Sequence, residues 1–292
     1  MSASHPPGVS PFKSDILKGQ VALVTGGGSG IGFEISRQLG LHGAAVAITG
    51  RRQPVLDSAV EAFCSEGINA IGIQGDVRKN QDCERWVEET CAKLGGLDIL
   101  VNCAAGNFMA SAEEISVNGF RTVMEINTIG TFAMSRAAFP AMRQRGGGRV
   151  VNISATLHYG ATWWQIWVDL IGGQGPAQHP IDDSISVAAG LSQLAGLSKL
   201  AGVDASKDDV NALVASTVPL GKVGSKWDIA IAAVFLCSSA ARHLTGDTLV
   251  MDGAAWMWRE PAVPRKMVSK ASRGVEAKSR ILGVAPAQRS KL

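Results

Sequence analysis

The stretch VALVTGGGSGIG, residues 21–32, decides how the chain is expected to fold. Its first five residues predict a buried strand, and the glycines after them let the backbone turn sharply and approach a pyrophosphate. A helix that begins at Gly30 would offer its free N–H groups to that anion. A glycine-rich loop alone can be a plain tight turn, but a strand before it and a helix after it favour a dinucleotide site. The candidate cofactor-binding residues here are Gly26, Gly27, Gly28, Ser29, Gly30, Ile31 and Gly32.

Short apolar strands alternate with amphipathic helices through the amino-terminal half. The expected strands are Val21–Thr25, Ala45–Thr49, Ala70–Gln74, Ile99–Asn102 and Arg149–Ser154. The expected helices are Gly30–His42, Gln53–Glu66, Asn80–Leu94 and Asn118–Arg143. Strands separated by helices of about ten to fifteen residues indicate βαβ units. The sequence therefore predicts an α/β fold, a three-layer doubly wound parallel sheet of the Rossmann type in a single domain.

The periodic pattern weakens after Trp167. Residues 169–217 are rich in Gly, Ala, Ser and Asp and contain one weak strand candidate, Ser184–Ala188, so the fold is expected to be degraded after the fifth strand. A helix over Trp227–Ser238 and a strand over Thr248–Met251 restore the pattern. The expected organisation is an N-terminal extension (1–18), a Rossmann-like reductase domain (19–258) and a basic C-terminal tail (259–292).

Composition and charge exclude several classes of protein. The 292 residues are 46% apolar and 18% charged, which is typical of a globular protein with a sizeable core. No apolar run is long enough to span a bilayer, and the N-terminus lacks the apolar block of a signal peptide. The net charge is +3, but the residues from Arg259 onward hold nine Lys/Arg and two Asp/Glu. The basicity therefore belongs to the tail, and a nucleic-acid-binding face is not expected.

The five cysteines show neither a CxxC pair nor a histidine at metal-ligand spacing. Free thiols are the expected state, with no metal site and no disulfide. The residues are Cys64, Cys83, Cys91, Cys103 and Cys237.

The residues after the second and third strands concern the choice of cofactor. An NAD site usually places a carboxylate after the second strand, whereas an NADP site places a cation against the 2′-phosphate. Arg51 and Arg52 stand there without an acid and predict NADPH, although both could simply begin a solvated helix. Asp76 and Val77 end the third strand, where they are placed to meet the adenine.

Four stretches resemble successive motifs of the short-chain dehydrogenase/reductase superfamily: Thr25–Gly32, Asn102–Gly106, Asn127–Gly130 and Val151–Ser154. More narrowly, GGGSGIGFEIS, GDVR, DILVNCAAGNFMA and NISATLHY are similar to the peroxisomal 2,4-dienoyl-CoA reductases, above all to plant forms. The resemblance is dense from Pro11 to Trp167 and resumes from Pro219 to Trp256. It implies three further cofactor-binding residues, Asn102, Ala104 and Gly106.

The resemblance implies an NADPH-dependent reduction of 2,4-dienoyl-CoA to 3-enoyl-CoA in the β-oxidation of unsaturated fatty acids. That reaction makes no alkoxide, so it needs hydrogen-bond donors to the thioester oxygen and a route for a proton from water. By resemblance Asn127 would orient the substrate or its proton donor, and Ser154 is a second candidate donor. A bridge between two strands through the backbone by Asn127 and a helix cap by Ser154 are the structural alternatives.

The resemblance also implies contacts with the acyl-CoA substrate. Its expected residues are Arg78, Asn107, Phe108, Ser116, Val117 and Asn118. An arginine suits the phosphates of CoA, although Arg78 could be a simple surface charge. The final Ser290-Lys291-Leu292 is typical of a peroxisomal signal that an import receptor reads, so a peroxisomal location is expected. The resemblance also implies a homo-oligomer, whose contacts the altered helix region would weaken.

The Tyr-x-x-x-Lys pair of the superfamily is missing. Counted forward from Ala155, its positions fall at Val168 and Gly172. The missing tyrosine is compatible with dienoyl reduction, but relatives retain the lysine, and its loss should cost about 1.5–3 kcal/mol of cofactor positioning. A spliced or frame-altered replacement of residues 168–196 is one explanation, and a diverged segment is the other. The alternative functions are another acyl-CoA or carbonyl reductase, or an impaired variant that only binds cofactor or partner subunits.

Overall fold

The computed structural model describes residues 9–106, 114–155, 184–189, 218–222 and 224–257. The chain divides into two compact units, Met1–Trp256 and Met257–Leu292. Apart from Met257, the second unit falls outside the described residues. The fold and the site that follow therefore belong to the first unit.

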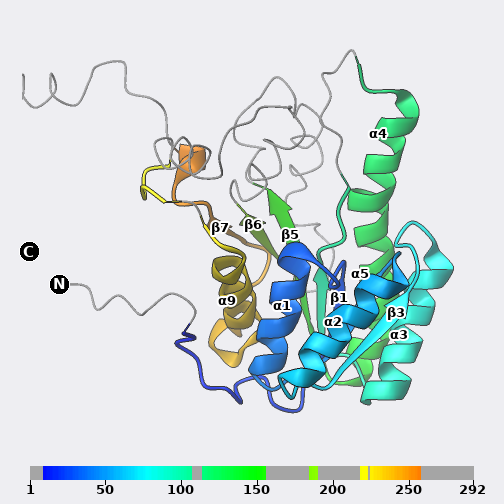
Figure 1. Ribbon diagram of the computed structural model, residues 1–292, viewed down its shortest axis with the longest axis vertical. Helices are drawn as coiled ribbons and strands as arrows, with labels where there is room; N and C mark the ends of the chain where they lie inside the picture. The colour runs from blue at the N-terminus through cyan, green and yellow to red at the C-terminus, as the bar shows by residue number, and fades with distance from the viewer. Residues whose placement is uncertain (1–8, 107–113, 156–183, 190–217, 223, 258–292) are drawn as a thin grey trace, which may run out of the picture. The chain divides into compact units, whose positions relative to one another are not determined.

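The sheet has seven parallel strands in the order β3-β2-β1-β4-β5-β6-β7 (Figure 1). The strands are β1 (Val21–Thr25), β2 (Ala45–Gly50), β3 (Ala70–Gln74), β4 (Ile99–Asn102), β5 (Arg149–Ala155), β6 (Ser184–Ala189) and β7 (Thr248–Met251). From β1 the chain first moves outward to β3 and then returns to place β4 on the other side of β1. This reversal creates a topological switch point, and it confirms the predicted doubly wound sheet.

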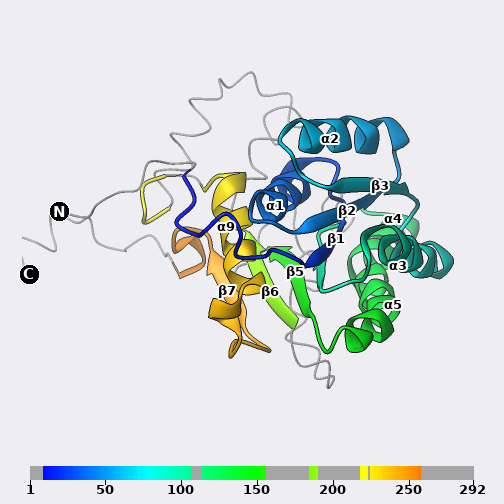
Figure 2. The ribbon, with the colours of Figure 1, turned by 90° about the horizontal axis from the view of Figure 1, so that it is seen from below.

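Helices cover both faces of the sheet (Figure 2). On one face lie α1 (Gly30–Leu41), α2 (Gln53–Ser65) and α9 (Lys226–Cys237), and on the other lie α3 (Asn80–Leu94) and α5 (Gly130–Gln144). Val24 and Ile48 point into the core under α1 and α9, whereas Leu23 and Ala47 point into the core under α3 and α5. Because both faces are buried, the central strands are continuously apolar, as the sequence predicted.

The long helix predicted over Asn118–Arg143 is interrupted in the middle. Its parts are α4 (Val117–Met124), a π-helical turn η1 (Glu125–Ile129) and α5. Backbone angles stay in the right-handed helical region through both junctions. A π turn inserts a residue without changing the apolar composition, so the 3.6-residue pattern of the sequence does not predict it.

Two short 3₁₀ turns, η4 (Ser239–Ala241) and η5 (Ala255–Met257), flank β7.

Residues before β1 contribute to the same core. Leu17 is fully buried and its N–H donates to the carbonyl of His42 at 2.9 Å. Ser10 Oγ lies 2.7 Å from His42 Nε2, and the ring of Phe12 packs edge-on against the imidazole. At least the end of the expected N-terminal extension therefore packs on the domain.

Candidate cofactor site

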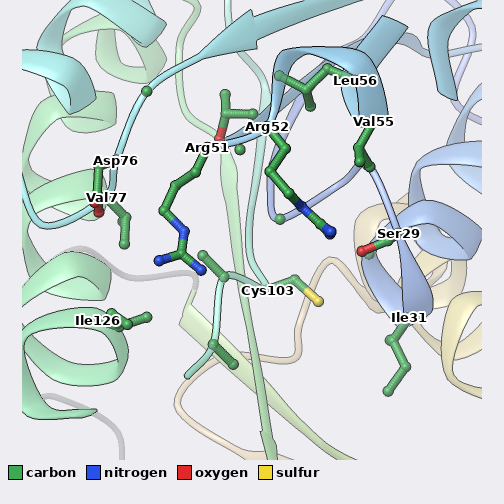
Figure 3. A pocket seen from close by; sticks show the side chains of 18 of the residues that line it. Ser29, Ile31, Arg51, Arg52, Val55, Leu56, Asp76, Val77, Cys103 and Ile126 are labelled. Atoms are coloured by element: carbon green, nitrogen blue, oxygen red, sulfur yellow. The ribbon is translucent and has the colours of Figure 1, made fainter. Parts of the chain in front are cut away.

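A cavity of about 370 Å³ lies at the carboxyl ends of the strands, at the switch point of the sheet (Figure 3). Ligands of open α/β sheets bind at this place, because the loops that leave neighbouring strands diverge there. Among the predicted residues, those that line the cavity are Gly26, Gly28, Ser29, Ile31, Gly32, Arg51, Arg52, Asp76, Val77, Ala104 and Ser154. The lining residues that the sequence analysis did not name as site candidates are Thr49, Gly50, Val55, Leu56, Gly75, Trp86, Cys103, Ala105, Ile126 and Ile153.

In the glycine loop between β1 and α1, side chains at Gly26, Gly27 and Gly32 would crowd neighbouring atoms. Gly26 has a φ of +69°, and a Cβ on Gly32 would lie 2.5 Å from the carbonyl oxygen of Gly26. The helix then begins after Ser29, whose hydroxyl forms no capping hydrogen bond. The first turn of α1 therefore presents its N–H groups without a side chain across them, which fits a pyrophosphate. Gly27 and Gly30 complete the loop although they do not line the cavity.

Arg51 and Arg52 follow β2 and extend from exposed positions into the cavity (Figure 3). Arg52 is also the N-cap residue of α2, so the alternative that these residues begin a helix is compatible with a cofactor role. Within the described residues neither guanidinium forms an ion pair. Two exposed cations at one mouth of the cavity favour a ligand that carries negative charge there.

Thr49 is a cavity residue that sequence reasoning missed. It is fully buried, and its Oγ1 has no hydrogen-bond partner among the described residues. A buried hydroxyl without a partner is costly, and a polar ligand in the cavity would remove that cost. Its signal in the sequence is alternation: two residues before Arg51, it lies on the same side of the strand. The glycine cradle and this hydroxyl together fit a bound dinucleotide.

Asp76 and Val77 follow β3, as predicted. Val77 is buried in the core under α3 and α5, and Asp76 is partly buried at the edge of the cavity. Both carboxylate oxygens of Asp76 accept from Arg78 Nε at 3.0 Å. The hydrogen bonds from Arg78 hold the pKa of this carboxyl below its usual value, against the effect of burial. Arg78 is exposed and does not line the cavity.

The loop after β4 is held from beneath by Thr25. Its Oγ1 accepts from the N–H groups of Cys103 and Ala104, both at 3.0 Å. Asn102 does not line the cavity; its side-chain amide donates to Asn152 Oδ1 at 2.9 Å, which joins β4 to β5. Burial raises the pKa of the Cys103 thiol to about 12, so this group stays protonated at neutral pH.

Asn127 lies in the π turn and does not line the cavity. Its Nδ2 donates to the carbonyl oxygens of Gly106 at 2.6 Å and Val123 at 2.9 Å, and its Oδ1 accepts from Gly106 N–H at 3.4 Å. The side chain thus ties the segment after β4 to the helix, whereas the structural alternative from the sequence was a bridge between two strands. A role toward the substrate stays a prediction.

The remaining candidates are scattered. Ser154 lines the cavity at the end of β5 and is partly buried. Ser116 caps α4 by accepting from Gly119 N–H at 3.0 Å, next to an exposed Val117, and Asn118 accepts from the guanidinium of Arg121. The predicted residues Asn107 and Phe108, and the positions Val168 and Gly172, lie outside the described residues.

Two further findings concern the described residues alone. No group of three or more His, Cys, Asp or Glu side chains gathers there in a way that could hold a metal ion. None of the helices in that part of the chain is long and apolar enough to cross a membrane.

Comparisons with known proteins agree with this site. Residues 20–164 match the short chain dehydrogenase family. A peroxisomal 2,4-dienoyl-CoA reductase, described as (3E)-enoyl-CoA-producing, from Arabidopsis thaliana is 47% identical over 93% of this chain and 96% of its own length. The protein of the same description from Danio rerio is 35% identical over 91% of each chain. The chain is a short-chain dehydrogenase/reductase of the peroxisomal 2,4-dienoyl-CoA reductase family.

The fold of this reductase family member agrees with solved structures. A crystal structure of a single-site variant of actinorhodin polyketide ketoreductase with NADPH superposes with a TM-score of 0.74 at 25% identity, over 82% of this chain and 98% of the ketoreductase. The cavity of the family member thus belongs to an oxidoreductase fold that uses a nicotinamide cofactor. The match to the short chain dehydrogenase family ends at residue 164, a few residues before the Val168 and Gly172 positions.

Proposed function

We propose that this chain reduces 2,4-dienoyl-CoA to 3-enoyl-CoA with NADPH, in the peroxisomal breakdown of unsaturated fatty acids. The observation that carries the proposal is a cavity lined by the glycine cradle, by Ser154 at the end of β5 and by two arginines without an ion pair in the described part of the chain. This cavity occurs in a chain 47% identical to the Arabidopsis reductase. The glycines alone would support any dinucleotide enzyme. The arginines and the relatives narrow the proposal to one cofactor and one substrate class.

NADPH is the proposed cofactor because of the charge at the end of β2. The backbone of the glycine loop and the first turn of α1 would hold the pyrophosphate, with Arg51 and Arg52 at the 2′-phosphate. Asp76 would accept from the 6-amino group of the adenine, and Val77, Ala104 and Ile126 supply apolar surface for the ring. The bound cofactor supplies a hydride to the substrate. Asn102 and Gly106, which do not line the cavity, would support the loop after β4 from the side away from the cofactor.

The chain's own residues would stabilise charge and deliver a proton. Negative charge develops on the thioester oxygen of the dienoyl group, and a hydroxyl placed within reach stabilises it. Ser154 is the proposed donor because it lines the cavity at the end of β5. Asn127 would maintain the backbone around Gly106 beside the substrate. Because no alkoxide forms, a proton that arrives from water suffices, and no tyrosine is required.

Other proposals concern the surroundings of the site. Arg78, with Asn107, Phe108 and residues 116–118, would contact the CoA portion of the substrate. Ser290-Lys291-Leu292 would direct the chain to the peroxisome through an import receptor. The organisation into an N-terminal extension (1–18), a reductase domain (19–258) and a basic tail (259–292) remains a proposal, as does a homo-oligomer.

The test follows NADPH oxidation with two substrates in parallel, a 2,4-dienoyl-CoA and a 3-ketoacyl-CoA, and with buffer alone as the blank. We expect turnover with the dienoyl thioester only, and mass spectrometry should find a product heavier by two hydrogens. Ser154→Ala should lower kcat about tenfold or more, since one oxyanion donor is removed. Ser58→Ala, an exposed serine whose hydroxyl bonds within α2, is the matched control. Preferred reduction of the 3-ketoacyl thioester would contradict the proposal.

A second candidate function is cofactor binding without turnover. The observation that favours it is Val168 and Gly172 at the positions of the superfamily's tyrosine and lysine. NADPH titration of the purified chain, followed by its melting temperature, tests the binding that both functions require, because a ligand that binds the native state stabilises it. The turnover assay then separates the two functions. Stabilisation by NADPH without any turnover of the dienoyl thioester would establish this second function.

A further inference from the structure

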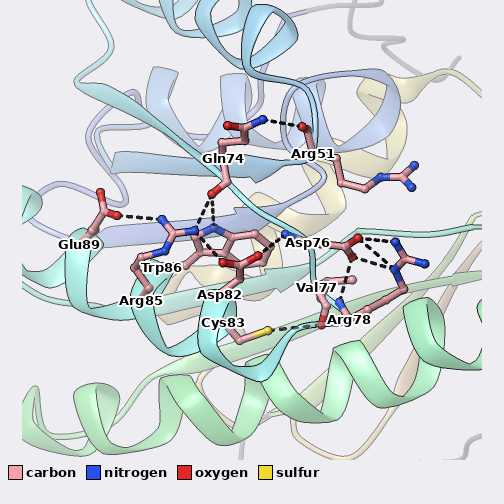
Figure 4. Close-up of polar contacts among 10 residues, drawn as sticks. All are labelled: Arg51, Gln74, Asp76, Val77, Arg78, Asp82, Cys83, Arg85, Trp86 and Glu89. Atoms are coloured by element: carbon pink, nitrogen blue, oxygen red, sulfur yellow. Dashed lines mark hydrogen bonds and ion pairs between the residues drawn. The ribbon is translucent and has the colours of Figure 1, made fainter.

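A polar cluster at the start of α3 holds the loop that carries Asp76 (Figure 4). Asp82, in the first turn of α3, accepts the backbone N–H of Asp76 at 2.8 Å. Its other carboxylate oxygen accepts from Arg85 Nη2 at 2.9 Å. Arg85 is held in turn by Glu89 at 2.9 Å. A side chain on a helix thus fixes the backbone from which the adenine-facing carboxylate extends.

The same cluster extends to the loop that carries Arg51. The carbonyl oxygen of Gln74 accepts from Arg85 Nη2 at 2.8 Å and from Trp86 Nε1 at 3.1 Å. The side-chain amide of Gln74 donates to the carbonyl oxygen of Arg51 at 3.0 Å. The end of β3 therefore connects helix α3 to both loops that frame the adenosine end of the cavity.

The junction is also tightly packed. Trp86 is 1% exposed, and a Cβ on Gly75 would lie 2.8 Å from its indole and 2.9 Å from the carboxyl carbon of Asp82. Gly75 N–H donates to the carbonyl of Gly50 at 3.0 Å, which continues the β2–β3 pairing past the end of β3. Little freedom is left for the backbone on either side of Asp76, so the loss of one of its hydrogen bonds should shift the position of Asp76.

We propose that Asp82 and Gln74 are positioning residues for the adenosine half of NADPH, each for a different part of it. Asp82 sets the place of Asp76, which accepts from the adenine 6-amino group. Gln74 sets the place of Arg51, which pairs with the 2′-phosphate. The proposal rests on the NADPH binding proposed above and assigns a different part of the bound cofactor to each of the two residues.

The experiment measures dissociation constants for three cofactors: NADPH, NADH, and the NADPH analogue with hypoxanthine in place of adenine, which lacks the 6-amino group. Asp82→Ala should raise the NADPH dissociation constant about tenfold and that of the hypoxanthine analogue less than about twofold. Gln74→Ala should raise the NADPH value about threefold and leave the NADH value unchanged. Glu84→Gln, which removes an exposed carboxylate from the same helix, should change none of these.

Asp82→Asn provides a second variant in case the alanine chain does not fold, because the amide oxygen can still accept from Asp76 N–H. This variant should also weaken the binding of NADPH more than that of the hypoxanthine analogue, by a smaller factor than Asp82→Ala. Equal weakening of adenine and hypoxanthine cofactors, or no weakening, would overturn the inference, since a merely structural role does not distinguish one amino group. If the unmodified chain fails to bind NADPH, the inference and the proposed cofactor both fall. If it binds NADPH without turnover, only the proposed reaction falls.

Discussion

The three arginines at the carboxyl edge of the sheet differ in what neutralises them. Arg51 and Arg52, after β2, extend into the cavity, and in the described part of the chain no carboxylate lies within ion-pair distance of either. Arg78, after β3, holds both carboxylate oxygens of Asp76 and stays outside the cavity. The two loops follow neighbouring strands of the same sheet, and each leads from its strand to the next helix.

The difference shows how a cation indicates an anion site. A guanidinium that already has a carboxylate must give up part of that interaction to bind a phosphate, whereas an unpaired one binds without that loss. Arg51 and Arg52 are therefore the stronger candidates for an anion. The sequence presented all three as candidate phosphate ligands, and only the contacts separate them.

The largest expected effect comes from removing the unpaired cations. Arg51→Gln combined with Arg52→Gln should raise the dissociation constant of NADPH about a hundredfold and leave that of NADH within about twofold, since two charge-assisted hydrogen bonds to the 2′-phosphate are lost. Fluorescence titration with both cofactors measures this. The double variant Arg136→Gln with Arg143→Gln removes two exposed charges from α5 and should bind both cofactors normally. An equal loss of NADH affinity would contradict the proposed role of Arg51 and Arg52 at the 2′-phosphate.

Removing the paired cation should act on the substrate instead. Arg78→Gln is expected to raise KM for the dienoyl-CoA about fivefold, because the proposed partner of Arg78 is a phosphate of CoA. KM for NADPH should rise by a smaller factor, because Asp76 loses its side-chain partner but keeps its backbone hydrogen bond to Asp82. Steady-state kinetics with each substrate varied in turn gives both values. A change confined to NADPH would instead place Arg78 with Arg51 and Arg52.

A smaller effect is expected from the buried hydroxyl near the unpaired pair. Thr49→Val should weaken NADPH binding about threefold and raise the melting temperature of the free protein, because it removes an unsatisfied polar group without changing the shape of the side chain. Titration and thermal denaturation of one preparation test both signs. A lower melting temperature without cofactor would show that the hydroxyl has a partner in the protein.

The smallest effect concerns the pH dependence of the Arg78–Asp76 pair. The hydrogen bonds of Arg78 lower the pKa of Asp76 from the ordinary 3.8, so the pair stabilises the folded state above that pH and is lost as the pH falls through the lowered value. Urea denaturation should therefore show Arg78→Gln less stable than the unmodified chain at neutral pH, with the difference shrinking below pH 3.8. Arg143→Gln should give a difference that does not depend on pH in this range.

Much of the fold and part of the site could be predicted because their causes are local. Each of the seven strands was expected within one residue of its end, including the weak candidate after Trp167. The glycine loop was expected from its position between strand and helix. The cavity residues Val55, Leu56 and Trp86 were missed, because they belong to helices whose apolar faces predict core packing and nothing more.

The role of a side chain was harder to predict than its place. The amide of Asn127 binds the backbone of a residue 21 positions earlier, a contact that the sequence did not predict. Gln74, which carried no signal, reaches the carbonyl of Arg51 23 positions before it. Neither partner is visible in a pattern of neighbours, since such contacts arise only when the loops of adjacent strands meet.

The amino acids themselves determined the parallel sheet, the glycine cradle and the positive end of β2, because periodicity, backbone freedom and charge are properties of short segments. The tertiary structure decided which arginine is neutralised, which hydroxyl is buried without a partner among the described residues, and which helix holds Asp76 in place. Those outcomes depend on distances between segments remote in the chain, and a hydrogen bond or an ion pair exists only within about 3–4 Å.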